Sequence, residues 1–163
     1  MNIKDHWQEI REEFQNNIKK SSYCAFATVD KAGNPHITPI GSLILAEACQ
    51  GFFFERFPEK MPKNFQTSDR VAVMTVNTGF FYWFRALRKG VFHSPPGLRL
   101  YGRVGELRPA TESELFIWQK KIRRAKGSRG YDILWKDMTR VRDIYFDDVR
   151  LVTAGAMTRS LWK

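Results

Sequence analysis

Several chemical signatures are missing from this sequence of 163 residues. Its only cysteines, Cys24 and Cys49, have no CxxC or CxxH neighbourhood. Each lies in or beside an apolar segment, so we expect buried thiols in place of a disulfide or a zinc site. The three histidines, His6, His36 and His93, have no metal-ligand spacing. No bound metal is therefore expected, and metal-dependent hydrolysis is a poor candidate function.

Motifs for catalysis and for membrane insertion are missing as well. The chain contains no GxSxG, no HExxH, no P-loop and no GxGxxG after a strand. No apolar run reaches the roughly 18 residues that a membrane span needs. The N-terminal segment MNIKDHWQEIREEF has no apolar signal region. We therefore expect a cytoplasmic protein without a membrane partner.

What is present indicates a folded protein. Hydrophobic residues make up 43% of the chain and include thirteen phenylalanines, which excludes a disordered chain. The length is sufficient for one domain with a substantial core. No repeat, low-complexity segment or linker divides it. We therefore treat residues 1–163 as a single domain.

The net charge of +10, from 27 basic and 17 acidic residues, leaves several partners open. Such a charge attracts nucleic acid, an anionic cofactor or an acidic substrate. Nucleic acid ranks second, because no C2H2, KH or RNP signature appears and the basic residues form separate clusters. These clusters are Lys60 and Lys63; Arg85, Arg88 and Lys89; and Lys120, Lys121, Arg123, Arg124 and Lys126.

Hydrophobic periodicity predicts two principal helices. Apolar residues recur at spacings of three and four over residues 3–19, which is typical of an amphipathic helix on a core. Thr111 followed by Glu114 is a capping-box pattern, and it predicts a helix over residues 112–125. A short helix is also compatible with residues 81–89.

The strand pattern predicts a barrel core over residues 23–107 and late strands over residues 141–153, followed by a tail at 154–163. A hairpin is expected at 23–45, because DKAGN supplies turn residues between two apolar runs. Further strands are predicted at 51–54, 70–76, 97–107, 141–146 and 149–153, with a turn at Asp147 and Asp148. The result is a mostly β, small antiparallel barrel with peripheral helices, and an α+β sandwich is the alternative.

The loop FERFPEKMPKNF carries the clearest binding signal. Arg56, Lys60 and Lys63 fall within eight residues, and Asn64 follows. Their donors can converge on a phosphate while the prolines turn the backbone. If Lys63 and Asn64 begin a helix, its amides add to the positive field. A solvated basic loop is the alternative interpretation.

The loop does not stand alone. The run ATVDKAGNPHITPIG, then FFFERFPEKMPKNF and then DRVAVMTV resembles the pyridoxamine 5'-phosphate oxidase-like family of FMN-binding split barrels. The resemblance is closest over residues 23–76 and extends more weakly through residues 99–108. It lies in the ordered spacing of four segments. It implies a split barrel that binds FMN and acts as an oxidoreductase on a small-molecule substrate.

Carried over residue by residue, the resemblance implies a cofactor site. Thr38, Pro39 and Ile40 would lie along the flavin ring, and Phe54 and Arg56 would end the next strand. Lys60, Lys63 and Asn64 would hold the phosphate. Two positions depart from the family pattern: Thr38 replaces a basic residue, and Met61 replaces the second residue of an Arg-Lys pair.

The resemblance also implies a homodimer with the flavin in a cleft between subunits. The aromatic run Phe80–Phe84 fits such an interface, because large aromatics are enriched there. Arg85, His93 and Arg99 are candidates for the substrate side. The signature of vitamin B6 oxidation is missing, and the catalytic residues are unassigned. Haem or a deazaflavin is the alternative ligand, and a barrel that binds single-stranded nucleic acid is the rival function.

Overall fold

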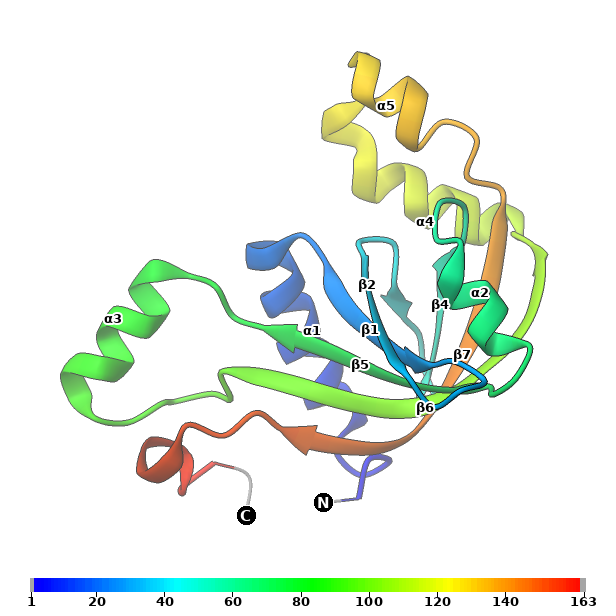
Figure 1. Ribbon diagram of the computed structural model, residues 1–163. Coiled ribbons are helices and arrows are strands. Elements are labelled where there is room, and N and C mark those ends of the chain that lie inside the picture. Colours follow the sequence, from blue (N-terminus) through cyan, green and yellow to red (C-terminus); the bar gives the residue numbers. More distant parts are fainter. Residues whose placement is uncertain (1, 162–163) are drawn as a thin grey trace.

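The computed structural model describes residues 2–161 and shows a seven-stranded antiparallel sheet with helices around it (Figure 1). The sheet order is β2-β1-β5-β6-β7-β4-β3. The strands are β1 (Cys24–Val29), β2 (Pro35–Ile40), β3 (Ile44–Leu45), β4 (Gln50–Phe54), β5 (Arg70–Val76), β6 (Gly97–Pro109) and β7 (Arg140–Leu151). The predicted fold class, a mostly β antiparallel split barrel, is confirmed.

The helices lie at the periphery, as predicted. They are α1 (Trp7–Ser21), α2 (Lys60–Phe65), α3 (Phe80–Lys89), α4 (Glu112–Ile122) and α5 (Arg129–Leu134), with 3-10 turns η1 (Arg123–Ala125) and η2 (Gly155–Thr158). Helix α3 extends beyond one end of the sheet, while α4 and α5 lie at the other side of the molecule (Figure 1). The capping box of α4 is formed, with Thr111 accepting from the Glu114 amide.

The first hairpin forms as the turn residues predict. The Asp30 side chain accepts hydrogen bonds from the amides of Ala32 and Asn34, both at 2.9 Å. Gly33 has a φ of +85°, which a residue with a side chain adopts only with strain. The turn therefore fixes the register of β1 on β2, in which Phe26 is opposite Thr38.

Strand β7 is one continuous strand, which corrects the prediction of two strands and a turn at Asp147 and Asp148. Tyr101 pairs with Asp148 while Gly102 pairs with Phe146, so Asp147 is the extra residue of a bulge. A Cβ atom at Gly102 would lie 2.3 Å from the Tyr145 carbonyl oxygen. Glycine thus permits the two strands to approach at the bulge.

Other boundaries also differ from the prediction. Helix α1 begins at Trp7, although Ile3 is still buried in the core. Helix α2 begins at Lys60, so Lys63 lies in its last turn and does not open the helix. The short strand β3 and helix α5 were not predicted from the sequence.

Two apolar clusters hold the elements together. The larger one joins α1 to the sheet and includes Phe26 and Phe53, whose ring centroids are 4.9 Å apart. The smaller one packs Phe54, at the end of β4, against Trp118 of α4. A buried ion pair between Glu55 and Arg142 connects the end of β4 to β7.

Within residues 2–161, no helix is long and apolar enough to cross a membrane. The cytoplasmic location stays a prediction. So does the single domain over residues 1–163, whose first residue and last two residues lie outside the described part of the chain.

Candidate functional site

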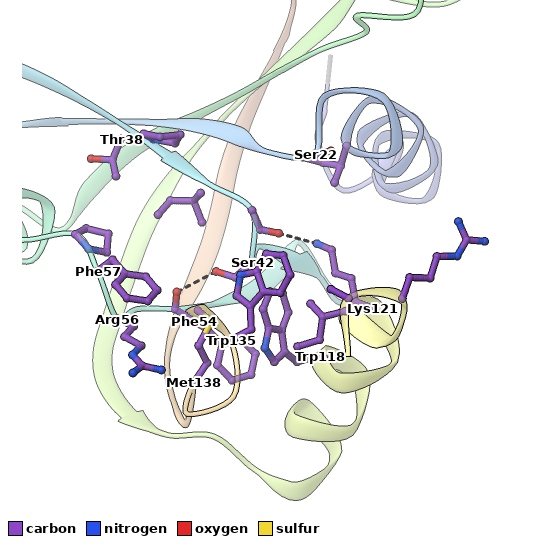
Figure 2. A pocket seen from close by; sticks show the side chains of 18 of the residues that line it. Ser22, Thr38, Ser42, Phe54, Arg56, Phe57, Trp118, Lys121, Trp135 and Met138 are labelled. Carbon is purple, nitrogen blue, oxygen red and sulfur yellow. Dashed lines mark hydrogen bonds between the residues drawn. The ribbon is translucent and has the colours of Figure 1, made fainter. Parts of the chain in front are cut away.

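A cavity of about 770 Å³ lies where the ends of β2 and β4 meet the segment from α4 to β7 (Figure 2). This volume suits a ligand of cofactor size. The residues that line it include Thr38, Pro39, Ile40, Phe54, Arg56, Trp118, Lys121, Arg124 and Trp135.

The strand wall of the cavity is built by β2 and the residues after it. β2 is an edge strand, which accommodates Pro39 because a proline cannot donate to a ladder. The Thr38 hydroxyl is 3.1 Å from His36 Nε2. Beyond the strand, Ser42 Oγ donates to the Phe54 carbonyl at 2.9 Å. This hydrogen bond fixes the end of β2 against the end of β4.

The helical wall is aromatic. The rings of Phe54 and Trp118 pack at 5.2 Å between centroids, and Trp135 also lines the cavity (Figure 2). Trp118 Nε1 is buried and has no hydrogen-bond partner among the described residues. Buried donors are usually paired. Because the nitrogen is itself buried, Trp118 offers the cavity the exposed part of its ring and not its N–H.

The charged groups that line the cavity are all basic. They are Lys19, Arg56, Lys121 and Arg124, and no aspartate or glutamate is among the described lining residues. The Arg56 guanidinium lies 3.7 Å from Asp137 and 5.2 Å from the centroid of the Phe57 ring. The cavity therefore favours an anionic ligand.

Lys121 is already engaged by the backbone. Its ammonium donates to the carbonyl of Gly41 at 2.9 Å and of Leu43 at 3.4 Å. The surrounding protein displaces water from this ammonium and lowers the pKa of Lys121, although much of the side chain stays exposed. Arg56 and Lys121 lie on opposite sides of the two tryptophans in Figure 2.

The nearby thiol of Cys24 is a structural group. Its Sγ lies 3.2 Å from the Ile40 carbonyl oxygen. Burial raises the pKa of Cys24 to about 12, so the thiol is protonated near neutral pH and is a poor nucleophile. Cys49 is also buried and free.

The structure brings five of the predicted cofactor residues together. Thr38, Pro39, Ile40, Phe54 and Arg56 all line the cavity. Three of them lie on β2, and the other two lie at the end of β4 or just after it; β2 and β4 are distant in the sheet order. Curvature of the sheet, which the sequence spacing does not reveal, places their ends side by side.

The other three residues of the predicted cofactor site, which were predicted to hold the phosphate, do not line the cavity. Lys60 and Lys63 are exposed on α2, just after the cavity residue Pro58. Asn64 is buried, and its side-chain nitrogen donates to Thr28 Oγ1 at 2.9 Å. That hydrogen bond attaches α2 to β1.

The candidates for the substrate side do not gather at the cavity. Arg85 is exposed on α3, His93 is exposed in the following loop, and Arg99 is exposed on β6. None of the three lines the cavity. Their proposed roles stay predictions.

Sequence reasoning missed the helical wall. Trp118, Lys121, Arg124, Trp135 and Met138 line the cavity; the helix that carries the first three was predicted, but not its place at the cavity. Trp118 and Lys121 are three positions apart, a spacing that any amphipathic helix can contain, so it did not indicate a binding site. The available signal was the concentration of aromatic and basic residues between 116 and 135.

The family comparison agrees with the fold and the cavity. The model of the pyridoxamine 5'-phosphate oxidase family matches residues 10–145, which is most of the chain. This chain belongs to the pyridoxamine 5'-phosphate oxidase family. The predicted family is thus confirmed. No curated protein sequence matches the chain.

Solved structures of this family's fold resemble the protein along most of its length. An FMN-binding protein from Syntrophomonas wolfei subsp. wolfei is 15% identical, with a TM-score of 0.60, and the match covers 93% of this chain and 95% of that one. HupZ from Group A Streptococcus is 18% identical, with a TM-score of 0.56 and coverages of 90% and 96%. An F420 reductase is 15% identical, with a TM-score of 0.53 and coverages of 78% and 88%. At these identities the likeness shows the fold.

Membership in the pyridoxamine 5'-phosphate oxidase family supports a flavin-type or deazaflavin-type ligand. The site fits such a ligand in two respects. Aromatic side chains offer apolar contacts to a planar ring, and the basic lining offers donors to a polar, anionic molecule.

Proposed function

We propose that this protein is an FMN-binding flavoprotein and an oxidoreductase that acts on a small molecule. The observation that carries the proposal is the cavity, which combines aromatic walls with an entirely basic set of charged lining residues. FMN, when bound, would supply the electron transfer. The chain's own residues would then bind and orient, which agrees with the lack of a sequence motif for acid-base catalysis.

The flavin ring would lie along the end of β2. Thr38, Pro39 and Ile40 form this wall, and Phe54 closes it at the base. The rings of Trp118 and Trp135, which also line the cavity, would pack against the flavin.

The phosphate would bind on the side of Arg56. Arg56 has only a loose ion pair, at 3.7 Å, with Asp137. Lys121, in contrast, already donates to two carbonyls. Lys60 and Lys63 lie on α2, four and seven residues after Arg56, and are exposed outside the cavity lining, so they would add positive charge from outside the cavity wall. In this arrangement Asn64 acts by holding α2 in place.

A second copy of the chain would complete the site. The sheet of β2, β1 and β5 exposes Ile37, Val29 and Met74. Ala27 lies opposite both Ile37 and Ala72, so small side chains separate the larger ones. This flat apolar surface adjoins the cavity at Pro39, and its burial between two subunits would close the open side of the flavin site.

Blocking the cavity tests the proposal. Replacing Thr38 with Trp introduces a large ring into the cavity, and we expect loss of FMN binding while the thermal unfolding temperature is retained. Phe116→Trp places the same ring on the exposed side of α4 and should bind FMN normally. Unchanged FMN binding in folded Thr38→Trp protein would contradict the assignment of the site.

A deazaflavin is the second candidate ligand, because an F420 reductase shares the fold. Both ligands have a planar tricyclic ring and a phosphorylated side chain. Parallel titrations with the two cofactors, and with haem as a third ligand, separate the possibilities. Tighter binding of the deazaflavin would replace FMN in the proposal and keep the site.

A further inference from the structure

Helix α3 presents an apolar face to solvent. Phe80, Phe84 and Leu87 recur at spacings of four and three, and Phe81 lies beside them. Their exposed fractions are 73%, 51%, 66% and 77%, respectively. The rings of Phe80 and Phe84 stack, with centroids 6.1 Å apart. The helix extends away from the sheet (Figure 1), so this face is accessible to a large partner.

The opposite face of α3 is firmly attached. Trp83 Nε1 donates to the Asn77 carbonyl at 2.5 Å, and the Tyr82 hydroxyl donates to the Ser94 carbonyl at 2.6 Å. Both rings pack against Phe92, whose centroid lies 5.2 Å from that of Trp83 and 5.5 Å from that of Tyr82. The phenylalanine face therefore points outward because the inner face is occupied, and it is ordered before any partner binds.

The charged residues of α3 are all positive. Helix α3 contains Arg85, Arg88 and Lys89 and no acidic residue. Lys20, at the end of α1, lies beside Gly79 at the start of α3. Long basic side chains next to exposed aromatic rings can extend to anionic headgroups while the rings enter the apolar boundary.

We propose that α3 docks on the surface of an anionic lipid bilayer. Phe80, Phe81, Phe84 and Leu87 would enter the boundary between headgroups and acyl chains. Arg85, Arg88 and Lys89 would contact the headgroups. The net charge of +10 adds a long-range attraction to the same surface.

A second copy of this chain fits the α3 face less well. Two such helices would bring their arginines and lysines together without a carboxylate from either helix. The face of β2, β1 and β5 that exposes Val29, Ile37 and Met74 is the better surface for self-association. The lipid inference replaces the expectation that Phe80–Phe84 lies at a subunit interface. The expectation of no membrane partner rested on the lack of a membrane-spanning segment. A helix that lies at the membrane surface needs no such segment, so the lipid inference also replaces that expectation.

Vesicle sedimentation tests the inference. The full chain is mixed with vesicles of phosphatidylcholine alone, or of equal molar amounts of phosphatidylcholine and phosphatidylglycerol. We expect binding to the mixed vesicles that decreases as salt is raised. The double variant Phe81→Ser, Phe84→Ser should bind at least about tenfold more weakly, because it removes two large apolar side chains from the contact.

Two matched controls accompany this variant. Phe116→Ser, Ile117→Ser removes two exposed apolar side chains from α4 and should bind vesicles normally. Arg85→Ser, Arg88→Ser should weaken binding to the mixed vesicles, whereas Lys120→Ser, Arg123→Ser removes the same charge elsewhere and should weaken it less. Failure of the wild type to bind mixed vesicles would overturn the inference. Equal losses of vesicle binding in the α3 and α4 double variants would also overturn it. The same holds if the α3 variant no longer forms a dimer but still binds vesicles as the wild type does.

Discussion

Replacing Arg56 with Ala tests which end of the cavity holds the phosphate. Arg56 has one loose ion pair, at 3.7 Å to Asp137, and its side chain is partly exposed. Its removal should therefore leave the fold intact. A charge-assisted hydrogen bond contributes about 1.5–3 kcal/mol. At about 1.4 kcal/mol for each factor of ten, we expect FMN affinity to fall by about 10- to 150-fold.

The assay compares FMN with riboflavin, which has the same ring and no phosphate. Quenching of flavin fluorescence gives both dissociation constants. We expect Arg56→Ala to weaken FMN binding while riboflavin binding is almost unchanged. Asp137→Ala is the matched control, because it removes the partner and keeps the cation, so FMN binding should be equal or tighter.

Two results would refute this reasoning. Equal losses for FMN and riboflavin would mean that Arg56 supports the fold of the site and not the phosphate. No loss for FMN would move the phosphate to the side of Lys121 and Arg124. If Lys60 and Lys63 hold the phosphate as the family resemblance implies, Lys60→Ala, Lys63→Ala should also weaken FMN binding at least about tenfold; an unchanged affinity would agree with their place outside the cavity lining.

Further predictions concern stability and reactivity. Glu55→Gln breaks the buried ion pair with Arg142, at 2.9 Å, and should lower the free energy of unfolding by about 3–5 kcal/mol in urea titrations; a loss below about 1 kcal/mol would contradict this. Cys24, whose pKa is raised to about 12 by burial, should react with a thiol reagent at pH 8 only as fast as the chain unfolds. Burial also raises the pKa of Glu13 above its ordinary 4.5, so this carboxyl binds more protons in the folded chain and its own contribution to stability should fall as pH rises from 4.5 through the folded pKa. Glu13→Gln should remove this dependence, and an unchanged pH profile would count against it.

The sequence predicted those parts of the fold whose signal is local. The DKAGN turn and the Thr111 cap act over four residues, and both appear in the structure as expected. The predicted turn at Asp147 and Asp148 was wrong, because two adjacent acidic residues are typical of a turn and here they lie at a bulge within β7. Only the pairing of β6 with β7, which depends on distant residues, shows that the strand continues.

The candidate site was predictable on one wall only. Thr38, Pro39 and Arg56 belong to segments whose ordered spacing resembles the family. The wall with Trp118 and Trp135 comes from the C-terminal part of the chain, where no motif signals a ligand. Its place over the cavity depends on how α4 packs on Phe54, a contact between residues far apart in the sequence.

The most direct test of the account is a titration of the purified protein with FMN, followed by flavin absorbance and fluorescence, with FAD, F420 and haem in parallel. Because the sequence shows one phosphate-sized basic loop, at residues 56–64, and no dinucleotide loop, we expect saturable binding of one FMN per chain, tighter than binding of FAD. Sedimentation of the same sample should give a dimer of roughly twice the 19.1 kDa chain mass. A protein that leaves FMN unbound, or that binds FAD or haem more tightly, would contradict the central claim.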